Sequence, residues 1–229
     1  MASDWSSPIS NDGPPAKAVV AELILVGLLL VYNGFSAFHL VLLLLLASQS
    51  LWLRHQGWSD LGLRRPPAIR RMLLQATAAS VVILVAVRVV IVPCAVMLAG
   101  VPVDLSALGE PGDTRALWRW LGQAWTLAAF GEEMVFRGYL MHRVVDLVGD
   151  TRLGWAVALV TSSTLFGLAH RYQGWAGVIA TASIGSLLGL LYLYSRRNLW
   201  PVIICHALVD TAALLVIYFD HSSWLFSAR

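Results

Sequence analysis

At residues 130–138 the chain reads Phe-Gly-Glu-Glu-Met-Val-Phe-Arg-Gly, which puts two adjacent carboxylates inside an otherwise apolar segment. Burying a carboxylate in hydrocarbon is costly, so a charged residue within a membrane helix usually has a function. On a helix, Glu133 and Arg137 are four residues apart and share a face, which favours an ion pair. Glu132 points about 100° away from Glu133, so it is not expected to pair with Arg137. The spacing therefore predicts that Glu133 and Arg137 hold the helix while Glu132 carries out chemistry; the alternative is one structural charge cluster.

The composition around this stretch is that of a membrane protein. Of the 229 residues, 58% are hydrophobic and only 13% are charged, and the mean hydropathy is +0.72. We expect a flexible tail at residues 1–16 and a single integral membrane domain at 17–229, whose partner is the lipid bilayer. The net charge is only +3, and no basic stripe with interleaved aromatic residues is present, so the sequence predicts no nucleic-acid partner.

The apolar segments predict an all-α fold, a polytopic bundle of about seven transmembrane helices around a polar cavity. No strand-like alternation is long enough to suggest a membrane barrel. Tyr32–Gly34 is a turn signal that divides the first apolar region into a hairpin, and Pro93 is expected to end the third span. The predicted spans are 18–31, 35–53, 72–92, a fourth starting near Leu117, 153–169, 175–195 and 199–218.

Basic residues set the expected orientation. With seven spans, the segments on one side carry eleven basic residues and those on the other side carry four. The remaining basic residue, Arg88, lies within the third span and is counted on neither side. The positive-inside rule then places the protein in the cell membrane with its N-terminus in the cytoplasm and its C-terminus outside. The eleven are Lys17, Arg54, Arg64, Arg65, Arg70, Arg71, Arg137, Arg143, Arg152, Arg196 and Arg197.

Two more polar pairs lie in apolar helices. The fifth span ends with Phe166-Gly-Leu-Ala-His170, and the seventh contains His206-Ala-Leu-Val-Asp210. His206 and Asp210 are four residues apart, so they share a helix face and can bond to each other or converge on one target. A lone histidine in a membrane helix is more often a packing residue. Here the polar residues are two histidines, an aspartate and a glutamate pair, and they lie on three helices. We expect them to share one site, because a single polar cavity can offset the free-energy cost of placing all of them in the membrane.

These three polar groups resemble the motifs EExxxR, FxxxH and HxxxN/D of the CPBP family. This family comprises CAAX proteases and bacteriocin-processing membrane proteins, and includes the Ras-converting CAAX endopeptidases. The segment Leu61–Pro66 also resembles the loop before the family's core, so the likeness covers about residues 58–219, with a catalytic core at about 117–219. The residues that carry the motifs are Glu132, Glu133 and Arg137, then Phe166 and His170, then His206 and Asp210.

The resemblance implies an intramembrane endopeptidase that cleaves a membrane-associated protein or peptide without a cofactor. Glu132 and His170 would hold and activate a water, while His206 and Asp210 would stabilise the oxyanion. The chemistry agrees, because peptide hydrolysis needs a base for water and donors for the oxyanion. Much of the family has asparagine at the position of Asp210, and an ionised aspartate cannot donate. Asp210 would then orient His206 or donate in its protonated form.

Three other functions remain open at this stage. In a zinc protease, Glu132, His170 and His206 would be the metal ligands, although the usual HExxH signature is absent. A transporter could use the same residues as a proton relay, but no inverted repeat is evident. A non-catalytic binding or immunity protein would not need Glu132. The substrate candidates are prenylated C-terminal tails, bacteriocin leaders, anti-sigma factors and the membrane tails of surface proteins.

Overall fold

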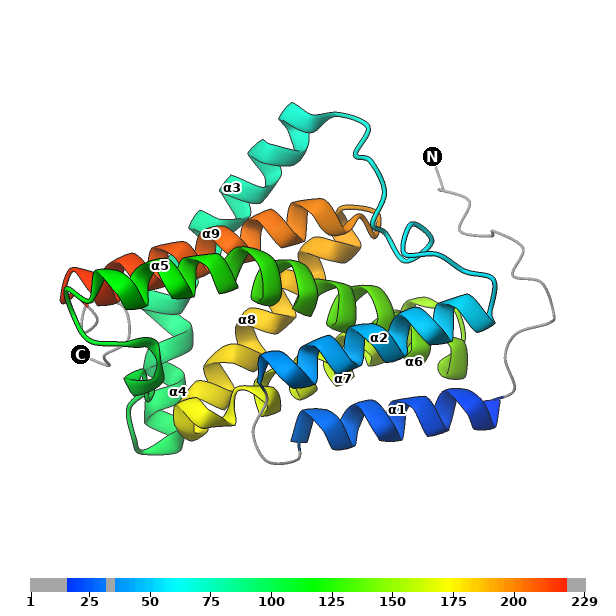
Figure 1. The fold of residues 1–229 in the computed structure, drawn as a ribbon, viewed down its shortest axis with the longest axis horizontal. Helices are drawn as coiled ribbons and strands as arrows, with labels where there is room; N and C mark the ends of the chain where they lie inside the picture. Colours follow the sequence, from blue (N-terminus) through cyan, green and yellow to red (C-terminus); the bar gives the residue numbers. More distant parts are fainter. Residues whose placement is uncertain (1–15, 32–35, 222–229) are drawn as a thin grey trace.

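The computed structural model describes residues 16–31 and 36–221 of the chain. The expected tail at 1–16, except its last residue, and the expected turn at Tyr32–Gly34 lie outside these residues. Within them the fold is all-helical, as predicted, and forms seven continuous helical rods (Figure 1). The helices are α1 (Ala16–Val31), α2 (Ala37–Leu53), α3 (Ile69–Ala86) continued by α4 (Val92–Ala99), α5 (Thr114–Gln123) continued by α6 (Met141–Val148), α7 (Arg152–Ala169), α8 (Gly174–Tyr194) and α9 (Leu199–Tyr218).

Four of the rods are long and apolar enough to cross a membrane by themselves. They are Ile69–Ala99, Arg152–Ala169, Arg171–Tyr194 and Leu199–Tyr218, and the 17-residue helix α2 is a shorter apolar helix. The rod from Thr114 to Val148 contains the glutamate pair; at about 1.5 Å per residue it is about 50 Å long, more than the roughly 30 Å of hydrocarbon in a bilayer. The predicted fourth span is not among the four described helices that are long and apolar enough to cross a membrane. The orientation of the chain stays a prediction.

The third rod corrects the sequence prediction at Pro93. The helix does not end there but continues to Ala99 and stops at Gly100, whose φ of 71° is left-handed. The residues just before the proline, Val87–Ile91, form a π-helical turn. Proline lacks the N–H that an α-helix would use, and a change of hydrogen-bond register in the preceding turn accommodates that loss. Gly100 ends the helix because it adopts the left-handed conformation without strain.

The fourth rod begins three residues earlier than predicted. Asp113 accepts a hydrogen bond from the backbone N–H of Ala116 at 2.9 Å and caps the helix at Thr114. Such a cap satisfies one of the N–H groups that every helix start leaves without a partner. The loop between the third and fourth rods is therefore 100–113, and it contains one 3-10 turn at Ser106–Leu108.

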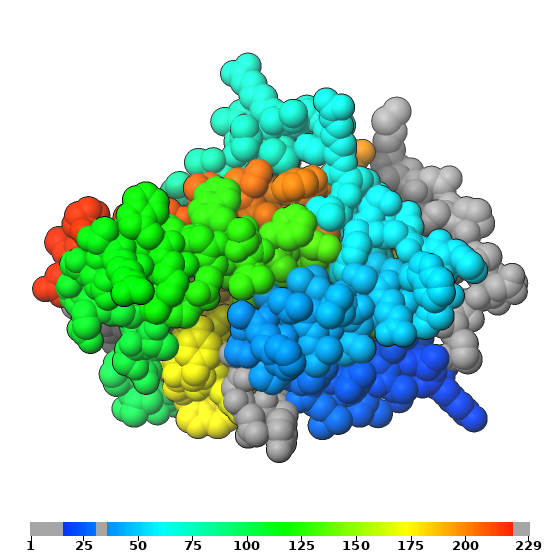
Figure 2. Space-filling view, viewed as in Figure 1, coloured from blue at the N-terminus to red at the C-terminus, as the bar shows by residue number. Residues whose placement is uncertain are grey.

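Helices α7 and α8 pack most closely, and small residues allow it. A Cβ on Gly167 would lie 2.6 Å from the carbonyl oxygen of Val178, and a Cβ on Gly185 would lie 2.9 Å from the Phe166 ring. Close approach through small residues is how membrane helices gain packing energy when lipid already surrounds their apolar side chains. Helix α3 packs against α9, and its N-terminal end is the uppermost part of the molecule in the views of Figures 1 and 2.

Candidate active site

The glutamate pair lies where the fourth rod is π-helical. One π-helical segment runs from Ala124 to Glu132 and another from Met134 to Leu140, with Glu133 between them. Such segments are rare and are frequent at functional sites, because they rotate side chains relative to a regular helix. Both Glu132 and Glu133 are buried, at 6% and 0% exposure. The site is thus built on an irregular helix inside the bundle.

Arg137 anchors this helix to its neighbours. Its Nη1 donates to Oε1 of Glu133 at 2.7 Å, and its Nη2 donates to the carbonyl oxygen of Gly185 on α8 at 2.9 Å. Its guanidinium carbon lies 4.5 Å from the centre of the Phe166 ring on α7. The predicted pair between Glu133 and Arg137 is therefore confirmed. The arginine is buried and links three helices, which suits a guanidinium with several fixed donors.

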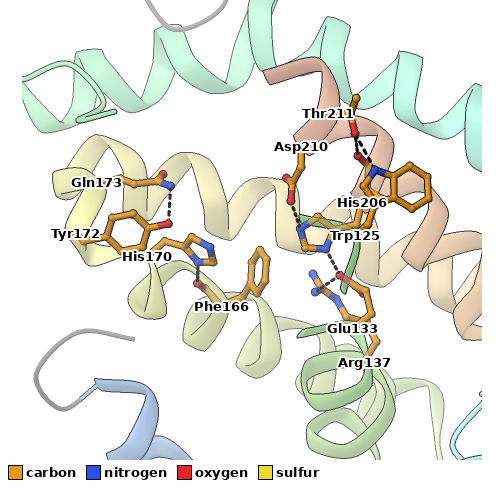
Figure 3. Close-up of polar contacts among 11 residues, drawn as sticks. Trp125, Glu133, Arg137, Phe166, His170, Tyr172, Gln173, His206, Asp210 and Thr211 are labelled. Carbon is orange, nitrogen blue, oxygen red and sulfur yellow. Dashed lines mark hydrogen bonds and ion pairs between the residues drawn. The ribbon is translucent and has the colours of Figure 1, made fainter. Parts of the chain in front are cut away.

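His206 lies between two carboxylates (Figure 3). Its Nδ1 is 2.7 Å from Oε1 of Glu133, and its Nε2 is 3.5 Å from Oδ2 of Asp210. The helix spacing predicted the contact with Asp210, which is the longer one. The contact with Glu133 was not predicted, because the two residues are far apart in the sequence. Glu133 thus holds both Arg137 and His206 through one oxygen atom.

Phe166 brings the two histidines together. Its ring centre lies 4.8 Å from that of His170 and 5.9 Å from that of His206, and it also packs edge-on against Phe136 at 5.0 Å. Nδ1 of His170 lies 2.8 Å from the carbonyl oxygen of Phe166. A carbonyl can only accept, so Nδ1 carries the proton and Nε2 of the neutral ring is left as an acceptor. His170 is therefore oriented by its own helix.

Glu132 is placed differently from Glu133. The Oε2 atom of each glutamate is buried without a hydrogen-bond partner, but Glu133 bonds to Arg137 and His206 through Oε1, whereas Glu132 forms no such bond within residues 16–31 and 36–221. Its carboxylate lies within electrostatic range of His206, Asp210 and Arg137. A buried polar atom without a protein partner calls for an explanation such as a water or a catalytic role. The structure thus groups Glu132 with His206 and Asp210.

Comparison with known proteins covers the same region. Residues 114–212 match the family described as Rce1-like, type II CAAX prenyl endopeptidase. Over this segment the chain is similar to the CAAX-protease family. Searches of curated proteins and of solved structures each returned no match. The family match supports an intramembrane protease, and it spans all seven predicted site residues, from Glu132 to Asp210.

The matched segment contains polar residues near the site that sequence reasoning missed. Tyr172 lies beside His170, with ring centres 5.7 Å apart, and its hydroxyl accepts a hydrogen bond from Gln173 Nε2 at 3.2 Å. Trp125 Nε1 donates to the hydroxyl of Thr211 at 3.1 Å, one residue after Asp210 (Figure 3). These residues follow no motif spacing, so only their positions in space connect them to the site.

The ligand set of the zinc alternative is not gathered in this candidate site. Over the part of the chain that the structure describes, no three His, Cys, Asp or Glu side chains are arranged to hold one ion. Nδ1 of His206 already contacts Glu133, and Nδ1 of His170 contacts a backbone carbonyl. Each histidine would therefore have to bind an ion through Nε2.

Proposed function

We propose that this chain is an intramembrane endopeptidase in which Glu132 is the general base on water. One observation carries the proposal: Glu132 is buried and forms no hydrogen bond or ion pair with the described residues, whereas Glu133 next to it is tied through Oε1 to Arg137 and His206. A carboxylate that bonds to nothing in the protein is available to accept a proton from water. Removal from bulk water also makes a carboxylate a stronger base.

The histidines complete the reaction. Nε2 of His170 accepts a hydrogen bond from the same water and holds it against the scissile carbonyl. His206 donates from Nε2 to the oxyanion, which requires protons on both ring nitrogens. The carboxylate of Glu133 at Nδ1 stabilises that charged form. An oxyanion donor of this kind accounts for about 100- to 1000-fold in rate in other hydrolases.

The reaction then follows in two proton transfers. As the water oxygen attacks the carbonyl carbon, its proton passes to the carboxylate of Glu132. When the tetrahedral intermediate collapses, the carbon–nitrogen bond breaks, and protonated Glu132 returns the proton to the leaving amine. The products are a carboxylic acid and an amine, which become a carboxylate and an ammonium group when the acid gives its proton to the amine, and Glu132 is ready for another cycle.

Asp210 acts through His206 in this scheme. Its carboxylate is 3.5 Å from Nε2, longer than the 2.7 Å contact between Glu133 and Nδ1. Glu133 therefore fixes the orientation of the imidazole. Asp210 either adds a negative charge next to Nε2 of His206 or, when protonated, donates a second hydrogen bond to the oxyanion beside Nε2. An asparagine could supply the second of these functions.

The substrate we propose is a membrane-associated peptide, with a prenylated CAAX tail as the first candidate because of the family match. The test uses purified wild type and Glu132→Gln in the same lipid, with prenylated and unprenylated forms of one peptide. Cleavage by the wild type alone supports the proposal. Equal cleavage by Glu132→Gln, measured by mass spectrometry of the products, would refute the role of Glu132. If no CAAX peptide is cleaved, membranes of a Glu132→Ala strain should accumulate the uncleaved native substrate.

A further inference from the structure

A pocket lies outside the glutamate–histidine site, where α3 begins, α8 ends and α9 begins. Its volume is about 190 Å³, enough for about six waters at their share of liquid volume. Three of the four candidate membrane spans have an end at this pocket. Span ends lie where hydrocarbon gives way to lipid headgroups. The pocket is therefore at the level of the headgroup phosphates.

The lining of the pocket is positive. Arg71 and Arg196 line it, and none of its described lining residues is acidic. Helix α3 starts beside it with Ala68 at the N-cap, which forms no side-chain cap, and its first turn has no acidic residue. At this helix start, therefore, no capping side chain accepts a hydrogen bond from the free N–H groups, and no acidic side chain balances the positive end of the helix dipole. An anion would satisfy both.

A buried hydroxyl adds a specific donor. Ser195 lines the pocket, and its Oγ is buried without a hydrogen-bond partner in the described part of the chain. Leaving such a group unsatisfied costs free energy, so its position needs an explanation. A rotation of the Ser195 side chain about χ1 would turn this hydroxyl toward a phosphate oxygen that the arginines bind in the pocket. The charge and the orphan hydroxyl are independent observations that favour the same ligand.

The turn that carries Ser195 and Arg196 is held in a fixed shape. Arg196 and Arg197 have φ values of 53° and 60°, in the left-handed region that side chains other than glycine rarely adopt. The carbonyl of Arg196 accepts from Nη2 of Arg64 at 2.8 Å, and Nδ2 of Asn198 donates to the carbonyl of Arg64 at 3.0 Å. Strained backbone persists only where its surroundings hold it, and it gathers at binding sites.

We propose that this pocket binds the phosphate of an anionic phospholipid. The neighbouring surface suits the rest of such a lipid: Ile69, Leu73 and Leu74 on α3 are exposed and can contact acyl chains, and Tyr194 is exposed on the rim. Tyrosine is typical of the membrane interface. Basic residues next to a span attract anionic lipids, and here they surround a shaped pocket instead of a flat surface.

The test is lipid binding by the purified, delipidated full-length protein, measured by native mass spectrometry. Phosphatidylglycerol is titrated against phosphatidylcholine for the wild type and for Arg71→Gln/Arg196→Gln. The double variant should bind phosphatidylglycerol about 30-fold more weakly, the loss expected for two arginines near a lipid phosphate. The matched control Arg115→Gln/Arg119→Gln removes the same charge from α5, away from the pocket, and should bind as the wild type does. Ser195→Ala should weaken binding without any change in net charge.

If the pocket and control variants lose the same affinity for phosphatidylglycerol, the effect is one of net charge and the proposal is overturned. Equal binding of phosphatidylglycerol and phosphatidylcholine by the wild type would also overturn it. Inorganic phosphate is added alone in a third arm. Protection of the wild type against thermal unfolding by phosphate, with no preference for phosphatidylglycerol, would assign the pocket to a soluble phosphate and overturn the lipid assignment. Lipid retention needs no peptidase activity, so the result stands whatever the outcome for Glu132.

Discussion

The Nδ1 atom of His206 lies 2.7 Å from Oε1 of Glu133, and the same oxygen accepts from Nη1 of Arg137 at 2.7 Å. One carboxylate oxygen therefore joins the motif on the fourth rod to the motif on α9. This arrangement separates two neighbouring glutamates by function. Glu133 is part of the framework that holds His206, and Glu132 is left for the substrate.

Exchanging each glutamate for glutamine should separate these roles. Glu133→Gln leaves the buried Arg137 without a counter-ion, and breaking a buried ion pair costs about 3–5 kcal/mol. We expect a lower folded yield and a lower unfolding temperature. Glu132→Gln should keep both and lose cleavage. Size-exclusion yield, thermal unfolding and peptide cleavage measure the three quantities. The reverse pattern would exchange the roles of the two residues.

Arg137→Ala should reduce the folded yield more than it alters the chemistry of the protein that survives. The substitution removes the bonds to Glu133 and to Gly185 and leaves His206 as the remaining partner of the buried Glu133 carboxylate. Breaking a buried ion pair in this way costs about 3–5 kcal/mol. Arg119→Ala, on α5, is the control and should fold normally. A normally folded Arg137→Ala that has lost cleavage would instead place Arg137 in contact with the substrate.

Asp210→Asn should retain most activity. Glu133 orients the imidazole of His206 from the other side, and the amide can donate where a protonated carboxyl would. If Asp210 instead holds His206 as a charged acceptor, the variant should lose orders of magnitude in rate, as other His–Asp pairs do. The rate of cleavage of one peptide by wild type and variant, compared at equal folded concentration, decides between these outcomes.

A strong chelator should leave cleavage unchanged, because the proposed reaction uses only protein groups and water. The measurement is the rate before and after extended chelation, with and without added zinc. Inactivation that zinc reverses would overturn the glutamate mechanism and make Glu132, His170 and His206 candidate ligands. In that case Asp210→Asn should also bind zinc about 10- to 100-fold more weakly, the usual cost of losing a partner behind a metal ligand.

Gly185→Ala should disturb the site through packing alone. The added Cβ would lie 2.9 Å from the Phe166 ring and 3.4 Å from Nη2 of Arg137, and overpacking of this kind costs about 1–3 kcal/mol. We expect reduced thermal stability and reduced cleavage together. Gly122→Ala is the control: it also lies on a helix, but its Cβ would meet nothing within 4 Å. The control should be neutral or slightly more stable, and equal losses in both would contradict the packing argument.

The sequence by itself determined the fold class, the approximate helix bounds and the pair of Glu133 and Arg137. These depend on local regularities: apolar length, turn residues and the four-residue spacing of a helix face. Helix α9 runs from Leu199 to Tyr218 as predicted. The break predicted at Pro93 was wrong, because a π-helical turn before the proline accommodates the missing N–H.

Only the tertiary structure decided which side chains meet across helices. His206 could have contacted Asp210 alone, but the packing of α9 against the fourth rod brings Glu133 to its other nitrogen. The contact of Arg137 with Gly185 likewise joins residues 48 positions apart. Sequence spacing specifies direction only within one helix, and the distance between helices is set by the packing of small and large residues along their whole length.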